Sequence, residues 1–300
     1  MKPFLNWAGG KRWLVSNYGQ LLNHPSKRFV EPFLGSGAVY FHVKPNEAIL
    51  SDMNQELIET YIAVRDEPDC VLHALQLHQG SHCKAHYYEV RSSKPRTSAG
   101  RAAKLIYLNR TCFNGLYRVN LNGEFNVPKG SKSAVLLPDD DFFAWSKLLK
   151  GACLLAQDFQ LTLDGVAAGD VVYVDPPYTV KHNMNNFVKY NEHIFSWADQ
   201  VRLSDCLQAV TQKGARVIVS NADNPLVLGL YPSGDWTHLT VNRHSRLAAS
   251  PEHRRPTTEV VIANCLAPNG EAVEPRACVS RTQSVEVSQT SADGSLDPKP

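Results

Sequence analysis

The residues best suited to chemistry are Asp175, Pro176, Pro177 and Tyr178, which directly follow the apolar run VVYV at 171–174. An apolar, β-branched run that ends at two prolines indicates a buried strand stopping at its carboxyl end. In open α/β sheets, ligands bind outside that end of the strands. Asp175 and the Pro176 carbonyl could accept two N–H bonds from an exocyclic amine, while Tyr178 stacks on the ring that carries it. The alternative is a simple proline turn, but the flanking acid and aromatic residue favour a binding site.

A glycine turn and an acid form a second candidate site. Gly35 and Gly37 follow the apolar run RFVEPFL (28–34) and precede the apolar start of a helix. A dinucleotide-binding fingerprint would need a third glycine where this chain has Tyr40, so the glycines alone are a weak signal. Asp52 ends the next predicted strand, and an acid at this place commonly bonds ribose hydroxyls.

Two further motifs complete a predicted pocket for an adenosine-bearing cofactor. Asp158 and Phe159, at the end of another predicted strand, could hold an adenine by its amino group and one face. In WAGGK (7–11), a Gly-Gly turn followed by Lys11 could hold a carboxylate or a phosphate, and Trp7 beside it argues against a flexible terminus. The chain contains no P-loop, which disfavours ATP as the ligand.

The composition is that of a soluble globular protein. The 300 residues are 43% hydrophobic and 20% charged, and a chain of this length can bury a substantial core. No apolar run approaches the roughly 18 residues that span a bilayer, and the N-terminus lacks a signal-peptide pattern. The seven cysteines are scattered without metal-ligand spacing. We therefore expect reduced thiols, no metal site and no membrane contact in a cytoplasmic protein.

Positive charge is concentrated in one segment. Between Arg91 and Lys132 there are nine Lys and Arg residues and one acid, Glu124, which gives 9 − 1 = +8 against a net charge of +2 for the whole chain. Aromatic residues such as Tyr117 and Phe125 are interleaved with these charges. A solvated face is the usual explanation of such a run, but the interleaving favours contact with nucleic acid.

The elements that must position these residues alternate between strand and helix. The order of strand, glycine turn, helix, strand and acid over 28–52 is typical of a doubly wound α/β fold with a mostly parallel sheet. That pattern resumes with predicted strands at 153–159, 171–174 and 215–221 and a predicted helix at 201–210. Two closing strands that follow are expected to be antiparallel. The intervening segment 66–140 is predicted to form short helices and a polar, basic loop.

These motifs together resemble Dam-like (D12 class) DNA adenine methyltransferases, which transfer a methyl group from S-adenosylmethionine to the N6 amine of adenine. The resemblance covers roughly 1–265 in the family's order. It is carried most specifically by YLNRTCFNGLYRVNLNGEFNVPKG (107–130) and VVYVDPPY (171–178), with FLNWAGGK (4–11), FVEPFLGSGAVYF (29–41), SDMNQELI (51–58) and VIVSNAD (217–223) in support.

The resemblance implies a class I, Rossmann-like methyltransferase core interrupted by an inserted target-recognition domain. We expect the first part of the core at 1–55, the inserted DNA-binding domain at 56–150 and the second part at 151–268. The segment 269–300 has almost no large apolar residues and is predicted to be disordered.

The resemblance also assigns roles to residues. Asp175, Pro176, Pro177 and Tyr178 match catalytic positions, and S-adenosylmethionine would be bound by Trp7, Lys11, Asp52 and Asp175. Gly35, Gly37, Asp158 and Phe159 complete the predicted cofactor pocket. Asn114, Leu116 and Arg118 match positions of the family's DNA-contacting loop, and Lys129 is expected to meet phosphates. The implied reaction is direct in-line transfer to an adenine flipped out of the duplex.

Three other functions fit the residues less well. Methylation of the cytosine exocyclic amine uses similar geometry, but Asp175 instead of serine at the first motif position argues for adenine. A catalytically silent DNA-binding regulator would not need the intact 175–178 motif. A nicotinamide-dependent dehydrogenase is disfavoured by Tyr40. We expect a monomer that acts on double-stranded DNA and is associated with the nucleoid through it, with a cognate restriction endonuclease as a candidate partner.

Overall fold

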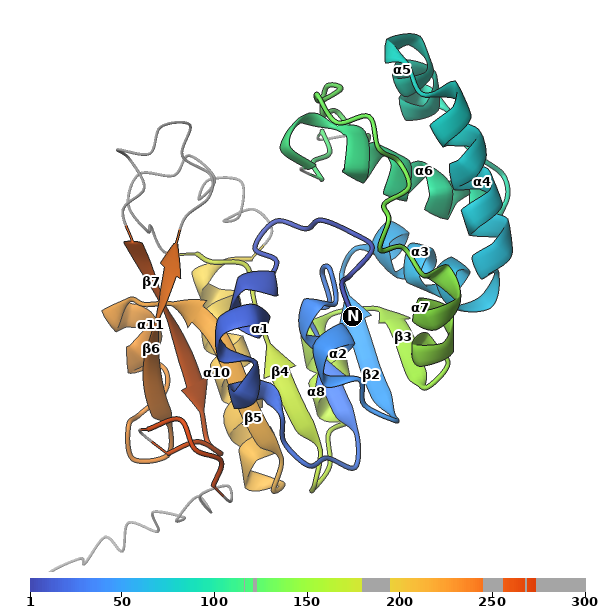
Figure 1. The fold of residues 1–300 in the computed structure, drawn as a ribbon. Coiled ribbons are helices and arrows are strands. Elements are labelled where there is room, and N and C mark those ends of the chain that lie inside the picture. Colours follow the sequence, from blue (N-terminus) through green and yellow to red (C-terminus); the bar gives the residue numbers. More distant parts are fainter. Residues whose placement is uncertain (116, 121–122, 180–194, 245–255, 268, 274–300) are drawn as a thin grey trace, which may run out of the picture.

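The computed structural model describes residues 1–115, 117–120, 123–179, 195–244, 256–267 and 269–273. Its centre is a seven-stranded sheet with the strand order β3-β2-β1-β4-β5-β7-β6 (Figure 1). The first five strands in the chain pair in parallel, and β7 runs antiparallel to both β5 and β6. The predicted α/β class with a mostly parallel sheet is confirmed. The strands are β1 (Phe29–Glu31), β2 (Ala48–Asp52), β3 (Ala152–Ala156), β4 (Val171–Val174), β5 (Arg216–Ala222), β6 (Thr237–His244) and β7 (Pro256–Ala263).

Helices flank the sheet and form a separate group beside it. None of those in the described ranges is long and apolar enough to cross a membrane. The helices are α1 (Arg12–Tyr18), η1 (Gly19–Leu22), α2 (Ala38–Val43), α3 (Gln55–Asp66), α4 (Pro68–Ser81), α5 (Lys84–Ser92), α6 (Ser98–Thr111), η2 (Phe113–Gly115), α7 (Phe142–Leu149), α8 (Phe159–Asp164), α10 (Trp197–Gln212) and α11 (Pro225–Gly229).

Both faces of the sheet are buried, and the strands divide the core into two clusters. Along β4, Val171 and Tyr173 pack in the cluster that includes α1, α2 and α3, whereas Val172 and Val174 pack with α8, α10 and α11. Successive side chains of a strand point to opposite faces, so a strand covered on both sides must be apolar throughout. This explains why the run VVYV shows no alternation of polar and apolar residues.

Three neighbouring strands, β2, β1 and β4, end side by side. We call this side of the sheet, where Asp52 and Asp175 follow or end their strands, the carboxyl edge. β1 pairs with β2 on one side and with β4 on the other, in registers that align Phe29 with both Ala48 and Val171. In the chain, β2 and β3 follow β1 and lie on one side of it in the sheet, whereas β4 comes next and lies on the opposite side of β1. Such a change of direction leaves a crevice between the two central strands, where ligands bind in open α/β sheets. Asp52 and Asp175 lie at this edge.

The inserted segment forms the second group of helices. In Figure 1, α4, α5 and α6 stand beside and above the β3 end of the sheet and do not cover its central strands. The helix α3 packs against α6 of this group and also against β2 and β3, while α7 contacts both α3 and α4. These two helices connect the insertion with the core. The domain boundaries at 56 and 150 remain predictions.

The segment that follows β7 begins with a paired turn. Residues 269–273 are described, and the amide of Val273 donates to the carbonyl of Cys265 at 2.8 Å. A β-bridge joins Leu266 and Ala272. The remainder of the predicted disordered tail, 274–300, lies outside the described residues.

A buried arginine fastens the insertion to the N-terminal segment. Arg110, on α6, is only 2% exposed and donates to the Phe4 carbonyl through Nε at 3.1 Å and Nη2 at 2.9 Å. It forms a two-pronged ion pair with Asp140 and also donates to the Val135 carbonyl at 2.7 Å. Three chain segments distant in sequence therefore depend on a single guanidinium group.

We predict that Arg110→Ala lowers the free energy of unfolding by about 3–5 kcal/mol, because it leaves the carboxylate of Asp140 buried without its partner. Arg101→Ala is the matched control, since Arg101 pairs with Glu59 at an exposed site, where such a pair is worth at most about 1 kcal/mol. Denaturant unfolding of both variants measures the difference. Equal losses would contradict the role given to Arg110.

Candidate active site

The glycine turn between β1 and α2 is a tight cradle. Gly35 and Gly37 have φ values of +47° and +65°, which favour glycine. A Cβ on Gly35 would lie 3.0 Å from Cδ1 of Trp7, and one on Gly37 would lie 3.0 Å from the Tyr61 hydroxyl. The sequence GSG therefore serves close packing as well as a left-handed backbone.

Asp52, at the end of β2, braces this turn. Its Oδ2 accepts a hydrogen bond from the Gly35 amide at 3.0 Å, and its Oδ1 accepts one from the Asn54 amide at 2.9 Å. Burial raises the pKa of Asp52, although these two hydrogen bonds act in the opposite direction. A carboxylate has about four acceptor positions, so acceptor capacity remains for a ligand hydroxyl.

Trp7 joins the cradle to the insertion. Its indole ring lies against Gly35 and stacks on Tyr117, with 4.8 Å between ring centroids and 23° between planes. The Tyr117 hydroxyl donates to Glu56 Oε2 at 2.9 Å, close to the start of α3. A ring of the predicted cofactor pocket and a ring of the predicted DNA-contacting loop are therefore in direct contact.

The predicted catalytic turn holds a buried ion pair. Lys11 Nζ lies 2.7 Å from Asp175 Oδ1, and the side chains are 3% and 17% exposed. Burial on its own would lower the pKa of Lys11, but the carboxylates of Asp175 and Glu259 outweigh it and raise the pKa. The ammonium group therefore stays charged beside Asp175.

Other side chains fix the rest of the turn. The Gln200 side chain on α10 donates to the Pro177 carbonyl at 3.4 Å and accepts from Asn221 of β5 at 3.2 Å. The Tyr178 hydroxyl donates to Glu259 Oε2 at 2.7 Å. Pro176 is buried. Side chains from α10, β5 and β7 thus hold the motif 175–178 in one conformation.

Glu31, at the end of β1, is a second buried acid of this edge. It is 3% exposed, and its Oε2 accepts from the Tyr40 amide at 3.2 Å. Burial raises the pKa of Glu31 well above its ordinary range, and the negative charge of Asp175 raises it further. The carboxyl end of the sheet therefore combines several acids with one buried cation.

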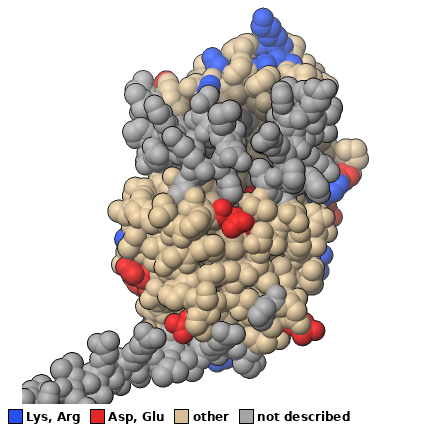
Figure 2. Space-filling model, turned by 90° about the vertical axis from the view of Figure 1, so that its left-hand side faces the viewer, with Lys and Arg blue, Asp and Glu red and all other residues tan. Residues whose placement is uncertain are grey.

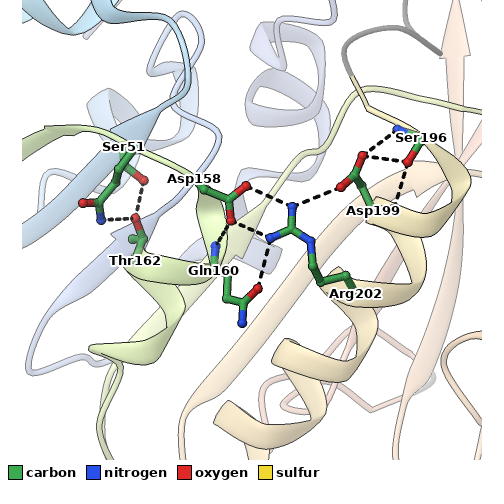
Figure 3. Close-up of polar contacts among 8 residues, drawn as sticks. Ser51, Asp158, Gln160, Thr162, Ser196, Asp199 and Arg202 are labelled. Atoms are coloured by element: carbon green, nitrogen blue, oxygen red, sulfur yellow. Dashed lines mark hydrogen bonds and ion pairs between the residues drawn. The ribbon is translucent and has the colours of Figure 1, made fainter.

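Asp158 and Phe159 are engaged with α10. Nη1 and Nη2 of Arg202 lie 2.6 Å and 2.9 Å from the two Asp158 oxygens (Figure 3). These hydrogen bonds lower the pKa of Asp158, which also caps α8 by accepting from the Gln160 amide. The Arg202 guanidinium lies 4.0 Å from the Phe159 ring centroid, and Phe33 stacks on the same ring at 5.4 Å. The role of this pair in holding adenine remains a prediction.

The predicted DNA-contacting residues lie on a short hairpin-like segment. Asn114 is exposed with a left-handed φ of +56°, and a β-bridge joins Val119 to Phe125. Arg118 is exposed, and its Nε donates to Asn126 Oδ1 at 2.9 Å. Lys129 pairs with Cys112 through an isolated bridge. Leu116 lies outside the described residues.

The strongly basic segment is partly neutralised by acids outside it. Arg110 pairs with Asp140 and Arg101 with Glu59, so both of these charges serve the fold. In the view of Figure 2, lysine and arginine side chains gather at the top of the molecule, over the inserted helices, and are sparse on the part below. This distribution agrees with the predicted nucleic-acid contact. Among the residues that the structure describes, no cluster of three or more His, Cys, Asp or Glu could hold a metal ion.

Comparison with known proteins identifies the family. The model of the D12 class of N6 adenine-specific DNA methyltransferases matches residues 7–246. The chain belongs to this family. This adenine methyltransferase is 34% identical over 273 residues to a type II methyltransferase from Lactococcus lactis subsp. cremoris, which covers 88% of this chain and 95% of the relative. It is 30% identical over 246 residues to the DNA adenine methylase of Escherichia coli K12, covering 81% and 88% of the two chains.

A third relative is a type II methyltransferase from Methanocaldococcus jannaschii, 34% identical over 246 residues, which covers 75% of this chain and 85% of the relative. The family resemblance expected from the motifs is therefore confirmed, as is adenine-specific DNA methyltransferase activity. The roles of individual residues in this adenine methyltransferase remain to be tested.

The structure brings together most of the residues that the sequence singled out and adds others. Trp7 contacts Gly35, whose amide bonds Asp52, and Lys11 contacts Asp175. The sequence reasoning missed the side chains that support them, namely Glu31, Gln200, Arg202, Asn221 and Glu259. A charged residue within an apolar strand run, as in EVVIA (259–263), was the available signal for Glu259.

We predict that the stability of the ligand-free enzyme depends on pH through Glu31. Because folding raises its pKa, Glu31 stabilises the fold below the ordinary glutamate pKa of about 4.3, and this contribution is lost as pH rises through the folded-state pKa. Glu31→Gln keeps an acceptor for the Tyr40 amide but does not titrate. Melting temperatures at pH 5 and pH 8 should therefore fall less between the two pH values in Glu31→Gln than in the wild type.

The exposed Glu47→Gln is the control for losing a glutamate and should follow the wild type at both pH values. If Glu31→Gln shows the wild-type pH dependence, Glu31 does not titrate in the way that its burial requires.

Proposed function

We propose that this enzyme transfers the methyl group of S-adenosylmethionine to the N6 amine of adenine in double-stranded DNA, after the base has flipped out of the duplex. The observation that carries the proposal is the Asp175–Tyr178 turn. It lies at the carboxyl edge of the sheet beside the switch point and has an acceptor, two prolines and an aromatic ring. Its neighbour Lys11 keeps Asp175 paired.

The chemistry of the pocket residues fits the proposed cofactor. Gly35 lets the Trp7 ring pack against the turn beside the proposed cofactor, and Asp52 can accept from ribose hydroxyls while it braces that turn. When bound, S-adenosylmethionine supplies a methyl group on a positively charged sulfur, which is already electrophilic.

The protein therefore has to supply position and electrostatics more than acid–base catalysis. Asp175 and the Pro176 carbonyl would accept the two amine N–H bonds and turn the nitrogen lone pair toward the methyl group. Tyr178 would stack on the base. Its hydroxyl is held by Glu259, so the position of the ring is restrained at both ends. Flipping the base costs about a few kcal/mol, and stacking on an aromatic side chain offsets part of that cost.

We propose that the insertion binds the duplex, with Asn114, Leu116 and Arg118 near the bases and Lys129 near phosphates. The basic surface at the top of Figure 2 supports this assignment. Two relatives named type II methyltransferases support an accompanying restriction endonuclease. The cytosine-directed and catalytically silent alternatives find no support in the comparisons, because the matching family model is specific for adenine.

We predict that Asp175→Ala reduces the rate of methyl transfer by at least about 30-fold to 1000-fold, which corresponds to a loss of ~2–4 kcal/mol of transition-state stabilisation. DNA affinity should be unchanged, because the insertion is not altered. Single-turnover transfer from labelled S-adenosylmethionine to a methylation-free duplex measures the rate, and mass spectrometry of the nucleosides identifies the product.

Asp205→Ala, an exposed substitution on α10, is the control and should keep the wild-type rate. Near-normal transfer by Asp175→Ala would disprove the assigned role of Asp175. A wild-type product of methylated cytosine, or no product at all, would disprove the proposed function itself.

We predict that Arg118 reads a base. Its Nε donates to Asn126, and the two terminal nitrogens of a guanidinium form a fork suited to the O6 and N7 acceptors of guanine. Arg118→Ala should slow methylation of the preferred site by roughly 5-fold to 150-fold, the equivalent of ~1–3 kcal/mol, and affect sites with one substituted base much less.

Methylation rates on preferred and singly substituted duplexes at several salt concentrations test this prediction. Lys129→Ala is the comparison: a phosphate contact should weaken all sites together and reduce the salt slope by about one. A uniform loss across sites in Arg118→Ala would show that Arg118 also contacts only phosphate.

A further inference from the structure

Glu259 is a buried acid at the carboxyl edge of the sheet, beside the proposed active site. It lies on β7, where its backbone pairs with Ala222 of β5 and Val241 of β6. Its side chain is 2% exposed. A carboxylate removed from water in this way destabilises the fold unless it has hydrogen-bonding or charged partners. The partners that Glu259 has therefore indicate what it does.

Two partners of Glu259 belong to the proposed catalytic site. The Tyr178 hydroxyl donates to Glu259 Oε2 at 2.7 Å, and Lys11 Nζ lies 3.6 Å from the same oxygen. Lys11 in turn lies 2.7 Å from Asp175 Oδ1 and 5.0 Å from the centroid of the Tyr178 ring. The contacts run from Tyr178 through Glu259 and Lys11 to Asp175, and both ends of this path belong to the same four-residue turn.

The first consequence concerns the Tyr178 ring. A tyrosine side chain can turn about two side-chain bonds, and stacking requires one orientation of the ring plane. The hydroxyl oxygen lies on the axis of the Cβ–Cγ bond, so a hydrogen bond there restricts rotation about Cα–Cβ and fixes where the ring lies. Rotation of the ring plane about Cβ–Cγ is restrained only weakly, through the preference of the O–H for the plane of the ring. The hydroxyl stays protonated and able to donate, because burial and the charge of Glu259 raise the pKa of Tyr178 well above its ordinary range. Glu259 thus holds the ring at the place where the base would stack.

The second consequence concerns Asp175. The Lys11 ammonium attracts two carboxylates, those of Asp175 and Glu259. The negative charge of each carboxylate reduces the degree to which Lys11 neutralises the other. Without the negative charge of Glu259, Lys11 would neutralise Asp175 more completely. Asp175 would then be a weaker acceptor for the amine of the base. The position of Glu259 therefore favours acceptance by Asp175 without direct contact with the base.

We propose that Glu259 is a positioning residue of the methyl transfer, which holds the Tyr178 ring in place and shares the charge of Lys11 with Asp175. This inference rests on the proposed function. It differs from a purely structural role, in which Glu259 would only compensate the buried Lys11. A structural role would be seen in stability and in the amount of folded protein, but not in the turnover of the molecules that fold.

Three variants separate these two roles. Glu259→Gln keeps a carbonyl oxygen that can accept from the Tyr178 hydroxyl but removes the negative charge. Tyr178→Phe keeps the aromatic ring and the charge of Glu259 but removes the hydroxyl donor. The double variant combines both changes, and Glu47→Gln, an exposed substitution, is the control for loss of a glutamate charge.

The measurements are kcat and KM for a duplex substrate, with single-turnover rates normalised to the folded fraction. For Glu259→Gln we expect kcat to fall roughly 10-fold to 100-fold and KM for DNA to change less than about 3-fold, because the interaction acts on the reacting geometry. Tyr178→Phe should lose about 5-fold or more in kcat. The double variant should lose clearly less than the product of the two single losses, because the residues act as a unit.

A wild-type kcat in Glu259→Gln, or losses in the double variant that simply multiply, would overturn the positioning role while leaving the proposed function intact. If Glu259→Gln does not fold, Tyr178→Phe decides, since it leaves the buried charges unchanged: a wild-type kcat in that variant overturns the proposal. A wild-type protein that methylates no adenine would overturn the proposed function, and this inference with it.

Discussion

The proposed active site depends on the burial of one positive charge, the ammonium group of Lys11. Lys11 is nearly as inaccessible as the apolar core, and an ammonium group in such a place is tolerated only with carboxylates close by. Asp175 and Glu259 supply them from β4 and β7, two strands separated in the sheet by β5. The ion pairs of Lys11 thus connect the N-terminal segment with the turn that contains Asp175 and with β7, which contains Glu259. Removing Lys11 would leave the carboxylates of Asp175 and Glu259 without their shared cation.

The sequence predicted those parts of the fold that depend on local pattern. Apolar runs ending at Pro176 and at Asp52 located β4 and β2, and the strands expected to be antiparallel became β6 and β7. The register of the sheet then placed Asp52 and Asp175 at one edge, as expected for parallel strands. These predictions succeeded because periodicity and chain-breaking residues act over a few positions.

Pairings between distant residues could not be predicted in the same way. The contact of Arg202 with Asp158 spans 44 residues, and that of Tyr178 with Glu259 spans 81. A single sequence says that each of these charges must be exposed or compensated, but not which partner compensates it. The basic segment shows the same limit, because its overall charge was evident while the burial of Arg110 against Asp140 was not. Charge counts describe a surface only after such internal pairs have been removed.

The stack of Trp7 on Tyr117 has a thermodynamic consequence. One ring lies against the glycine turn of the proposed cofactor pocket, and the other belongs to the segment proposed to meet DNA. If two different ligands favour the same arrangement of this ring pair, each would raise the affinity of the enzyme for the other. This is heterotropic cooperativity. Linkage requires the effect to be reciprocal, so that any factor by which one ligand changes the affinity of the other applies equally in reverse. The order in which the enzyme gathers its substrates would then affect rates, but not the stability of the ternary complex.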